Sequence, residues 1–226
     1  MLFRRFSIIA GLIIVICHAS LALAQGMIDA PAPELSFGTG YAHISLGSHS
    51  AIDGEDAWRF ESTVSFSPFE QLPQVRLGAA LGTSFVVSSS DNNSALIIGN
   101  GSVFFFGNGD VPLWTLEPEV RLSWRQTFGR HDLYFIEPGI SAGGAFAWLD
   151  LHSHTHDDFY NYHDVSFHGY DETFYARAFL RGGIQVPSGV IGIEGSWLQG
   201  GRLDFGGNAS GDLQEFYIGF YGAFRF

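Results

Sequence analysis

The sequence predicts an all-β fold, a transmembrane up-and-down antiparallel β-barrel. Segments in which apolar and polar residues alternate recur along the chain and are separated by turn-forming residues. The final segment, Phe216–Phe226, alternates large apolar residues with small or polar ones and ends on an aromatic residue. Arginine and glutamate supply most of the charge within these segments, and the chain contains no lysine. These observations favour strands with one face toward lipid and the other toward a closed interior.

The N-terminus is typical of an exported protein. Residues 1–24 begin with Arg4 and Arg5, continue through an apolar stretch too short to cross a membrane as a helix, and end in the small-x-small site Ala22-Leu23-Ala24. The only cysteine, Cys17, lies within this stretch, so neither disulfides nor thiol catalysis is expected in the mature chain. We therefore expect a signal peptide, a periplasmic lead and a barrel, at residues 1–24, 25–33 and 34–226.

Nine segments carry the alternation expected of barrel strands. They are residues 34–47, 57–67, 74–87, 95–106, 113–126, 131–148, 173–186, 190–203 and 213–226. The segment 95–106 is the weakest of them, because Gly99-Asn100-Gly101 interrupts it. A barrel with both termini on one side of the membrane needs an even number of strands. We predict eight strands, with ten as the alternative.

Three segments separate their faces most clearly. In residues 57–67 the apolar face carries Trp58, Phe60, Val64 and Phe66. In residues 113–126 it carries Trp114, Leu116, Val120, Leu122 and Trp124, and in residues 173–186 it carries Phe174, Ala176, Ala178, Leu180, Ile184 and Val186. Tryptophans fall at strand ends, where membrane barrels carry an aromatic girdle, at Trp58, Trp114, Trp124 and Trp148.

The opposite faces of the segments collect charges of both signs in nearly equal numbers. The arginines are Arg59, Arg76, Arg121, Arg125, Arg177, Arg181 and Arg225, and the glutamates are Glu61, Glu117, Glu119, Glu137, Glu194 and Glu215. Guanidinium groups match carboxylates in geometry, and an unpaired charge is costly to bury. We therefore predict that these residues form an ion-pair network in the lumen.

The links between segments differ in length, and this difference orients the barrel. Pro187-Ser188-Gly189 and Gly129-Arg130 are short, whereas residues 149–172 and 204–211 are long. Outer-membrane barrels have short periplasmic turns and longer extracellular loops. We therefore expect the two short links in the periplasm and the two long ones outside the cell.

The chain resembles the bacterial outer-membrane β-barrel superfamily, of the small OmpA-like type. The resemblance rests on Ala22-Leu23-Ala24, the alternating strands and the terminal segment Phe216–Phe226, and it spans about residues 34–226. It implies a location in the outer membrane, with membrane lipid and lipopolysaccharide as partners. In this family the barrel-assembly machinery recognises the terminal aromatic strand, which here carries Phe216, Ile218, Phe220, Phe224 and Phe226.

The overall charge argues against a nucleic-acid partner. The formal net charge is −12, whereas a protein that binds nucleic acid needs a basic surface. The sequence does not predict the oligomeric state.

Histidines and aspartates gather in the stretch Asp150–Glu172, which we expect to be an extracellular loop. Imidazoles beside carboxylates suit zinc, nickel or copper, and His152, His154 and His156 would project to one side of an extended segment. A divalent metal site at these three histidines is one hypothesis. The alternative is a solvated hydrophilic loop, which is favoured because the spacing matches no defined zinc motif. No other cofactor is predicted.

No catalytic residues are predicted. Parts of the chain loosely resemble lipid A deacylases, which use a His-x-Ser pair because serine needs an adjacent base. The matching stretch here, Ser196-Trp197-Leu198-Gln199, contains no histidine, and nothing in the sequence favours His43 or the histidines of residues 150–172 as a substitute base. Glu117-Pro118 and Glu137-Pro138 recur in neighbouring strands, and their glutamates are better read as lumenal ion-pair residues than as an acid–base pair.

The sequence thus favours a non-enzymatic outer-membrane barrel with a structural or surface-interaction role, which presents an acidic, histidine-rich extracellular loop. The first alternative is a small channel or transport-related barrel, favoured if ten strands leave a water path. The second is an enzyme that modifies lipid A. An eight-stranded barrel is filled by its own side chains, so a wide pore is not expected.

Overall fold

The computed structural model describes residues 33–47, 54–86, 94–98, 102–106, 113–156, 162–206 and 209–225. Within these ranges, the side chains of residues 94–98, 102–106 and 150–167 are not described. The predicted signal peptide, the predicted lead up to residue 32 and Phe226 lie outside the described residues. Among the residues that are described, no helix is both long enough and apolar enough to span a membrane.

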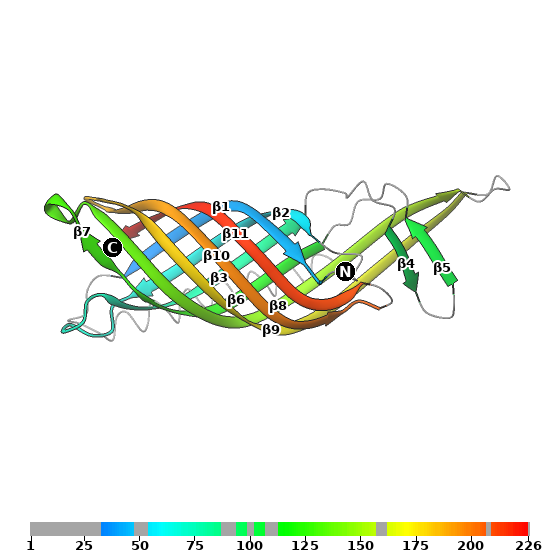
Figure 1. Cartoon of the computed structure of the whole chain (residues 1–226), viewed down its shortest axis with the longest axis horizontal. Coiled ribbons are helices and arrows are strands. Elements are labelled where there is room, and N and C mark those ends of the chain that lie inside the picture. The colour runs from blue at the N-terminus through cyan, green and yellow to red at the C-terminus, as the bar shows by residue number, and fades with distance from the viewer. Residues whose placement is uncertain are drawn as a thin grey trace.

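Eight antiparallel strands of the described chain form a closed barrel (Figure 1). They are β1 (Glu34–Ser45), β2 (Glu55–Phe66), β3 (Val75–Val86), β6 (Leu113–Trp124), β8 (Tyr134–His156), β9 (Tyr162–Val186), β10 (Gly189–Asp204) and β11 (Ser210–Arg225). Their order is β6-β3-β2-β1-β11-β10-β9-β8, and pairing between β6 and β8 closes the ring. The short β7 (Gln126–Phe128) continues the line of β6 and also pairs with β8. The prediction of eight strands is confirmed.

The ninth candidate segment, residues 95–106, is not a barrel strand. It forms two short strands, β4 (Ser94–Ile98) and β5 (Ser102–Phe106), which pair only with each other. The interruption at Gly99-Asn100-Gly101 falls between them. Without this segment the barrel has an even number of strands, as is needed when both termini lie on the same side of the membrane.

The stretch Asp150–Glu172 differs from the predicted loop. β8 and β9 pair continuously from Tyr134↔Ile184 to His156↔Tyr162, so most of this stretch is a β-hairpin that projects beyond the other strands (Figure 1). We call the paired residues 150–156 and 162–168 the projecting hairpin. A loop was predicted because the alternating segments end at residue 148 and resume at residue 173, with a hydrophilic stretch between them. A hairpin beyond the barrel wall needs no apolar face, so its composition does not distinguish it from a loop.

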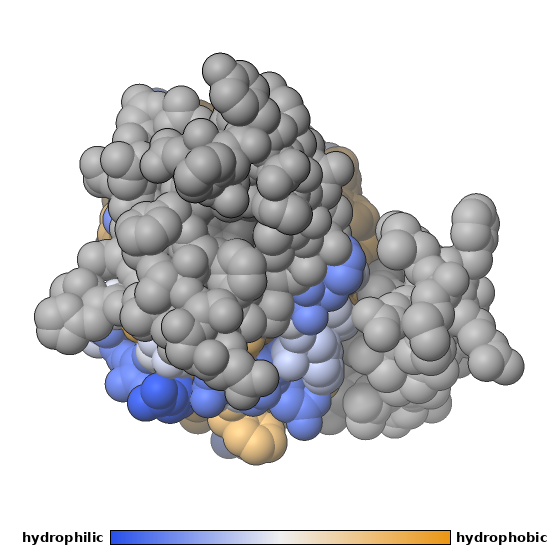
Figure 2. Space-filling model, turned by 90° about the vertical axis from the view of Figure 1, so that its right-hand side faces the viewer, coloured by the Kyte–Doolittle hydropathy of each residue, from blue (hydrophilic) through white to orange (hydrophobic). Residues whose placement is uncertain are grey.

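The barrel has two different ends. The end that contains Glu34 and Arg225 is called the terminal end here, and its turns at residues 67–74, 129–133 and 187–188 are short. The end from which the projecting hairpin extends is called the hairpin end. Seen from the hairpin end, the visible described residues form a mainly hydrophilic rim (Figure 2).

Alternation along each strand divides the side chains into an outer and an inner set. The outer set contains the large exposed apolar residues, with Phe174 87%, Phe220 73% and Val120 66% exposed. All five tryptophans of the chain lie on this outer surface, at Trp58, Trp114, Trp124, Trp148 and Trp197. In β11 the outward positions are Phe216, Ile218, Phe220, Gly222 and Phe224, while Tyr217 and Tyr221 are buried inside. The surface of the wall is therefore apolar, and the charge lies within.

Candidate functional site in the barrel interior

The interior of the barrel consists of three zones along its axis. An apolar cluster fills the hairpin end, an arginine–glutamate network fills the middle, and a smaller cluster around Glu34 lies at the terminal end. The alternation of each strand explains the zones, because inward positions change from apolar to charged along its length. In β2, for example, Ala57 is followed inward by Arg59, Glu61 and Thr63.

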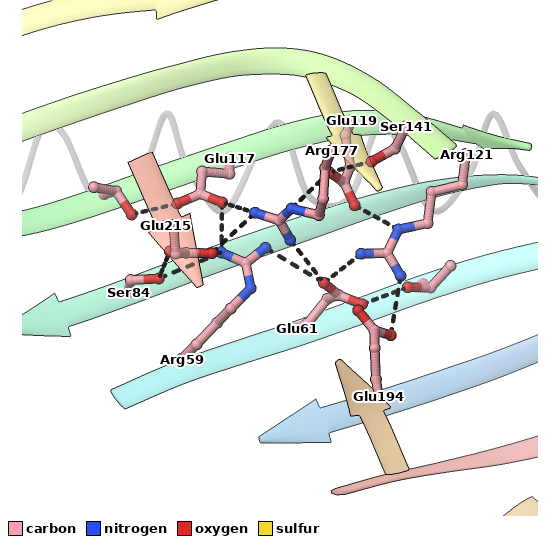
Figure 3. Close-up of polar contacts among 12 residues, drawn as sticks. Arg59, Glu61, Ser84, Glu117, Glu119, Arg121, Ser141, Arg177, Glu194 and Glu215 are labelled. Carbon is pink, nitrogen blue, oxygen red and sulfur yellow. Dashed lines mark hydrogen bonds and ion pairs between the residues drawn. The ribbon is translucent and has the colours of Figure 1, made fainter. Parts of the chain in front are cut away.

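The central network joins four arginines to five glutamates of the barrel. Figure 3 shows the five glutamates with Arg59, Arg121 and Arg177. Its members are Arg59, Arg121, Arg177, Arg181, Glu61, Glu117, Glu119, Glu194 and Glu215. Every one of these side chains is at most 5% exposed. All nine belong to the set that alternation assigns to the lumen, and the structure brings them into one continuous network.

Arg59 and Arg177 share two carboxylates near the hairpin end of the network. Both donate to Oε2 of Glu117, and each places Nη within 3.2 Å of Oε1 of Glu215. The hydroxyl of Ser84 donates to the second oxygen of Glu215 at 2.9 Å. Each carboxylate thus contacts two guanidinium groups and accepts a bond from one hydroxyl, that of Ser84 for Glu215 and that of Thr115 for Glu117. Such full pairing is the condition for burying charge at low cost.

Glu61 lies at the centre of the network and contacts all four arginines. Its Oε2 lies 3.3 Å from Nη2 of Arg59 and also accepts a bond from Arg121. Arg177 approaches the same oxygen at 3.5 Å, and Arg181 approaches Oε1 at 3.3 Å. Because β2 and β9 lie on different parts of the ring, Glu61 ties distant strands together across the lumen.

Two further glutamates complete the network on either side of Glu61. Glu119 accepts bonds from Arg121, from the Ser141 hydroxyl at 2.9 Å and from the Tyr175 hydroxyl at 2.9 Å. Glu194 accepts a bond from Nε of Arg181 at 2.6 Å. The tyrosine contact was not predicted from the sequence, although Tyr175 alternates in phase with the inward arginines of its strand.

A second ion-pair cluster closes the terminal end. Arg125 binds Glu34 with two parallel hydrogen bonds of 2.8 and 2.9 Å, and its Nε donates to Glu137 at 2.6 Å. Arg76 lies 3.3 Å and Arg225 3.6 Å from the same Glu34 oxygen. Glu34 is only 2% exposed and holds three arginines, yet sequence reasoning missed it. Glu34 could have been identified from its position at the start of the first strand, where it pairs with Arg225.

Aromatic rings line the interior beside the charges. Arg121 lies 4.8 Å and Arg181 5.3 Å from the centre of the Phe179 ring. Similar contacts join Arg59 to Tyr217, Arg125 to Phe135, Arg177 to Tyr175 and Arg181 to Tyr221. A cation over the face of a ring is attracted by the ring quadrupole, so the rings stabilise guanidinium groups that have left water. Sequence reasoning did not assign this role.

The hairpin end of the interior is packed with apolar side chains. Ala42, Ile44, Leu198 and Leu203 are fully buried there, and the rest of the cluster comprises Leu46, Ala57, Leu113, Ala145, Ala147, Leu149, Tyr175, Phe205, Ala209, Leu213 and Tyr217. This cluster was also missed, because the apolar faces were expected to meet lipid. The cluster could have been predicted from the run Ala145-Phe146-Ala147-Trp148-Leu149, which is apolar on both faces.

The residues considered for catalysis do not converge. Ser196 is 5% exposed and faces the lumen, whereas His43 lies on the outer face beside Asp56, with Nδ1 3.4 Å from Oδ1. Glu117 and Glu137 are each bound by arginine, in the central network and in the terminal-end cluster respectively. The barrel wall therefore separates the serine from this histidine.

The three histidines of the metal hypothesis occupy alternate positions of β8. In the backbone register His152 pairs with Ser166 and His154 with Asp164, while His156 pairs with Tyr162. Their side chains lie outside the described set, so the metal site stays a prediction. Among the side chains that are described, no group of three or more His, Cys, Asp or Glu residues is arranged to hold a metal.

Comparison with known proteins finds similarity in fold only. Neither the protein-family models nor the curated proteins give a match. Neisserial surface protein A is 8% identical, with 87% of this chain and 99% of that chain covered and a TM-score of 0.48. Ail of Yersinia pestis is 10% identical, with 86% and 99% covered and a TM-score of 0.46. The N-terminal β-barrel domain of Pseudomonas aeruginosa OprF is 11% identical, with 88% and 100% covered and a TM-score of 0.41.

Proposed function

We propose that the chain is a non-enzymatic, non-conducting barrel of the bacterial outer membrane that presents the projecting hairpin at the cell surface. The observation that carries the proposal is the polarity of the wall. Large apolar side chains such as Phe174 and Phe220 point outward around the barrel, while Arg59 and Arg177 are fully buried inside. A barrel in water would have the reverse arrangement, whereas lipid favours this one.

Closure of the sheet supports insertion into a bilayer. In lipid no water is present to bind backbone groups, so only helices and closed barrels span the hydrocarbon region. Here β1 pairs with β11, and β6 pairs with β8, so neither end of the strand order is left as an open edge. The signal-like N-terminus provides a route of export, and the terminal aromatic strand fits the assembly route that the family resemblance implies.

The packed interior favours a structural or surface role over transport. The apolar cluster at the hairpin end and the ion pairs in the middle occupy the same lumen in series. A small barrel that is filled by its own side chains leaves no wide aqueous path. The channel reading therefore has no specific observation in its favour.

The orientation follows from the two ends of the barrel. The terminal end has short turns, whereas the hairpin end carries β4, β5 and the projecting hairpin. Short turns face the periplasm in bacterial outer-membrane barrels. The projecting hairpin then lies outside the cell, where it is available to a partner.

Cysteine labelling in intact cells tests both orientation and surface presentation. A Ser166→Cys variant, in the projecting hairpin, is expected to react with a membrane-impermeant maleimide. A Ser188→Cys variant, in the β9–β10 turn, is expected to react only after the outer membrane is permeabilised. Labelling of the parent chain is the control for any maleimide reaction with Cys17. Equal labelling of both variants in intact cells would contradict the proposal.

A further inference from the structure

The outer wall of the barrel contains an apolar groove near the terminal end. The groove has a volume of about 440 Å³ and crosses β8, β9 and β10. Its lining is almost entirely apolar and includes Phe128, Tyr134, Ile184, Ile191 and Ile193. We call it the glycine groove, because Gly182 lies in it at a position where the neighbouring strands carry large side chains.

The register explains why the wall is hollow at this point. Gly182 pairs with Ile136 of β8 on one side and with Ile193 of β10 on the other. All three positions face outward, so a glycine between two isoleucines removes one side chain from an otherwise filled row. A Cβ added at Gly182 would have its nearest neighbour at 3.8 Å, so the space is open rather than occupied by another part of the wall.

Two stacked aromatic rings line the groove at the terminal end, and the turn that connects them contains an exposed arginine. Phe128 and Tyr134 stack with ring centroids 5.9 Å apart, and the turn between them contains Arg130, His131 and Asp132, all exposed. Seven arginines of the barrel bind carboxylates inside, but Arg130 forms no ion pair within the part of the chain that the structure describes. It thus offers a guanidinium group at the edge of an apolar surface.

We propose that the glycine groove binds one acyl chain of an anionic glycerophospholipid, whose phosphate is bound by Arg130. This inference rests on the proposed membrane location. The groove begins at the turn, so an acyl chain lying in it would place its headgroup at the level of the turn, where aromatic girdle residues meet the membrane interface. A guanidinium group is well suited to phosphate, and the apolar lining suits the chain. The lipid belongs to the periplasmic leaflet, because the terminal end faces the periplasm.

Retention of lipid by the purified barrel tests the proposal. The protein is reconstituted into vesicles with equal amounts of dioleoyl phosphatidylglycerol and dioleoyl phosphatidylcholine, extracted into mild detergent, and examined by native mass spectrometry. The parent chain is expected to retain phosphatidylglycerol in preference. Losing one charged contact corresponds to about a tenfold loss of affinity, so Arg130→Ala should remove most of the preference. Gly182→Leu, which fills the groove, should remove retention of both lipids.

Matched variants exclude general effects. Gly144→Leu places the same side chain at another outward glycine of the barrel, on β8 beyond the groove, where a Cβ has its nearest neighbour at 3.7 Å. Arg202→Ala removes an exposed arginine near the hairpin end. Both should retain lipid as the parent chain does. Electrophoresis of heated and unheated samples shows whether each variant is folded.

The results separate failure of this inference from failure of the proposed function. A parent chain that inserts and folds but shows no preference for phosphatidylglycerol would overturn the inference alone. Equal retention by the parent and Gly182→Leu chains, or a second copy of the chain found in place of lipid, would also overturn it. A chain that does not insert into vesicles at all would contradict the membrane location and the inference together.

Discussion

Arg59 shows how a charge is held inside the barrel. Its side chain has no exposed surface and contacts the carboxylates of Glu61, Glu117 and Glu215. Gly82 provides the space for it, since a Cβ at that position would lie 2.1 Å from Nη2 of the guanidinium. The arginine therefore depends on partners from three strands and on a missing side chain in a fourth.

Replacing Arg59 by methionine is expected to destabilise the barrel strongly. The substitution keeps much of the volume but leaves Glu117 and Glu215 with one cation fewer. Removing one partner of a buried ion pair typically costs about 3–5 kcal/mol. Urea unfolding of the lipid-reconstituted protein, followed by tryptophan fluorescence, measures the loss. The control Arg202→Met, at an exposed arginine, should change the free energy of unfolding by less than about 0.5 kcal/mol. Similar values for the two variants would mean that the network does not stabilise the barrel.

From the sequence alone we could predict which face of a strand each charged residue occupies, but not which residues form ion pairs with one another. Alternation assigns Arg59, Glu61 and Arg181 to one side because side chains in a strand repeat with a period of two. Which of them meet depends on register and strand tilt around the closed ring, and neither is encoded in a single segment. Glu34 was missed for this reason, since its three arginine partners come from elsewhere in the chain.

At the scale of elements, β8 and β9 are much longer than the other strands. They have 23 and 25 residues, compared with 12 in β1, β2, β3 and β6. β8 pairs with β6 only as far as Leu149, which itself pairs with Gly169 of β9. Beyond this point β8 has no partner in β6. The barrel strands were predictable because one face must be apolar. The projecting hairpin could not be predicted in this way, because a strand outside the barrel wall needs no apolar face.

Shortening the projecting hairpin is therefore expected to leave the barrel intact. Replacing residues 151–167 by an Asn-Gly turn joins the paired residues Asp150 and His168 with a two-residue connection that suits a hairpin. Changing loop length alters the entropy of closure only slightly, so the free energy of unfolding should stay within about 1 kcal/mol of the parent value. The heat-dependent shift in electrophoretic migration should also persist. A variant that no longer folds would show that the hairpin is part of the barrel's stable unit.

Considered as a whole, the molecule combines a closed sheet with a filled interior. The strand order closes through β6 and β8, and the interior is occupied from the terminal end to the hairpin end. The closed eight-stranded sheet could be predicted from alternation, parity and the weak ninth segment. The apolar cluster that caps the lumen could not, because an inward alanine or leucine has the same sequence pattern as an outward one.

The side chains that fill the lumen predict the absence of steady conductance. Parent protein reconstituted in planar lipid bilayers should give no regular single-channel steps, because the apolar cluster and the ion pairs block the path in series. Insertion is checked in the same preparation by the electrophoretic shift on heating. Uniform conductance steps from fully inserted protein would contradict the structural role and support the channel alternative.

Quenching of tryptophan fluorescence by phospholipids brominated in their acyl chains tests most directly whether the apolar wall faces lipid. All five tryptophans lie on the outer surface of the barrel. Protein reconstituted into brominated vesicles should therefore lose much of its emission relative to protein in unbrominated vesicles of the same chain length. Equal emission in the two kinds of vesicle, together with quenching by iodide in water, would show that the tryptophans face water and not lipid.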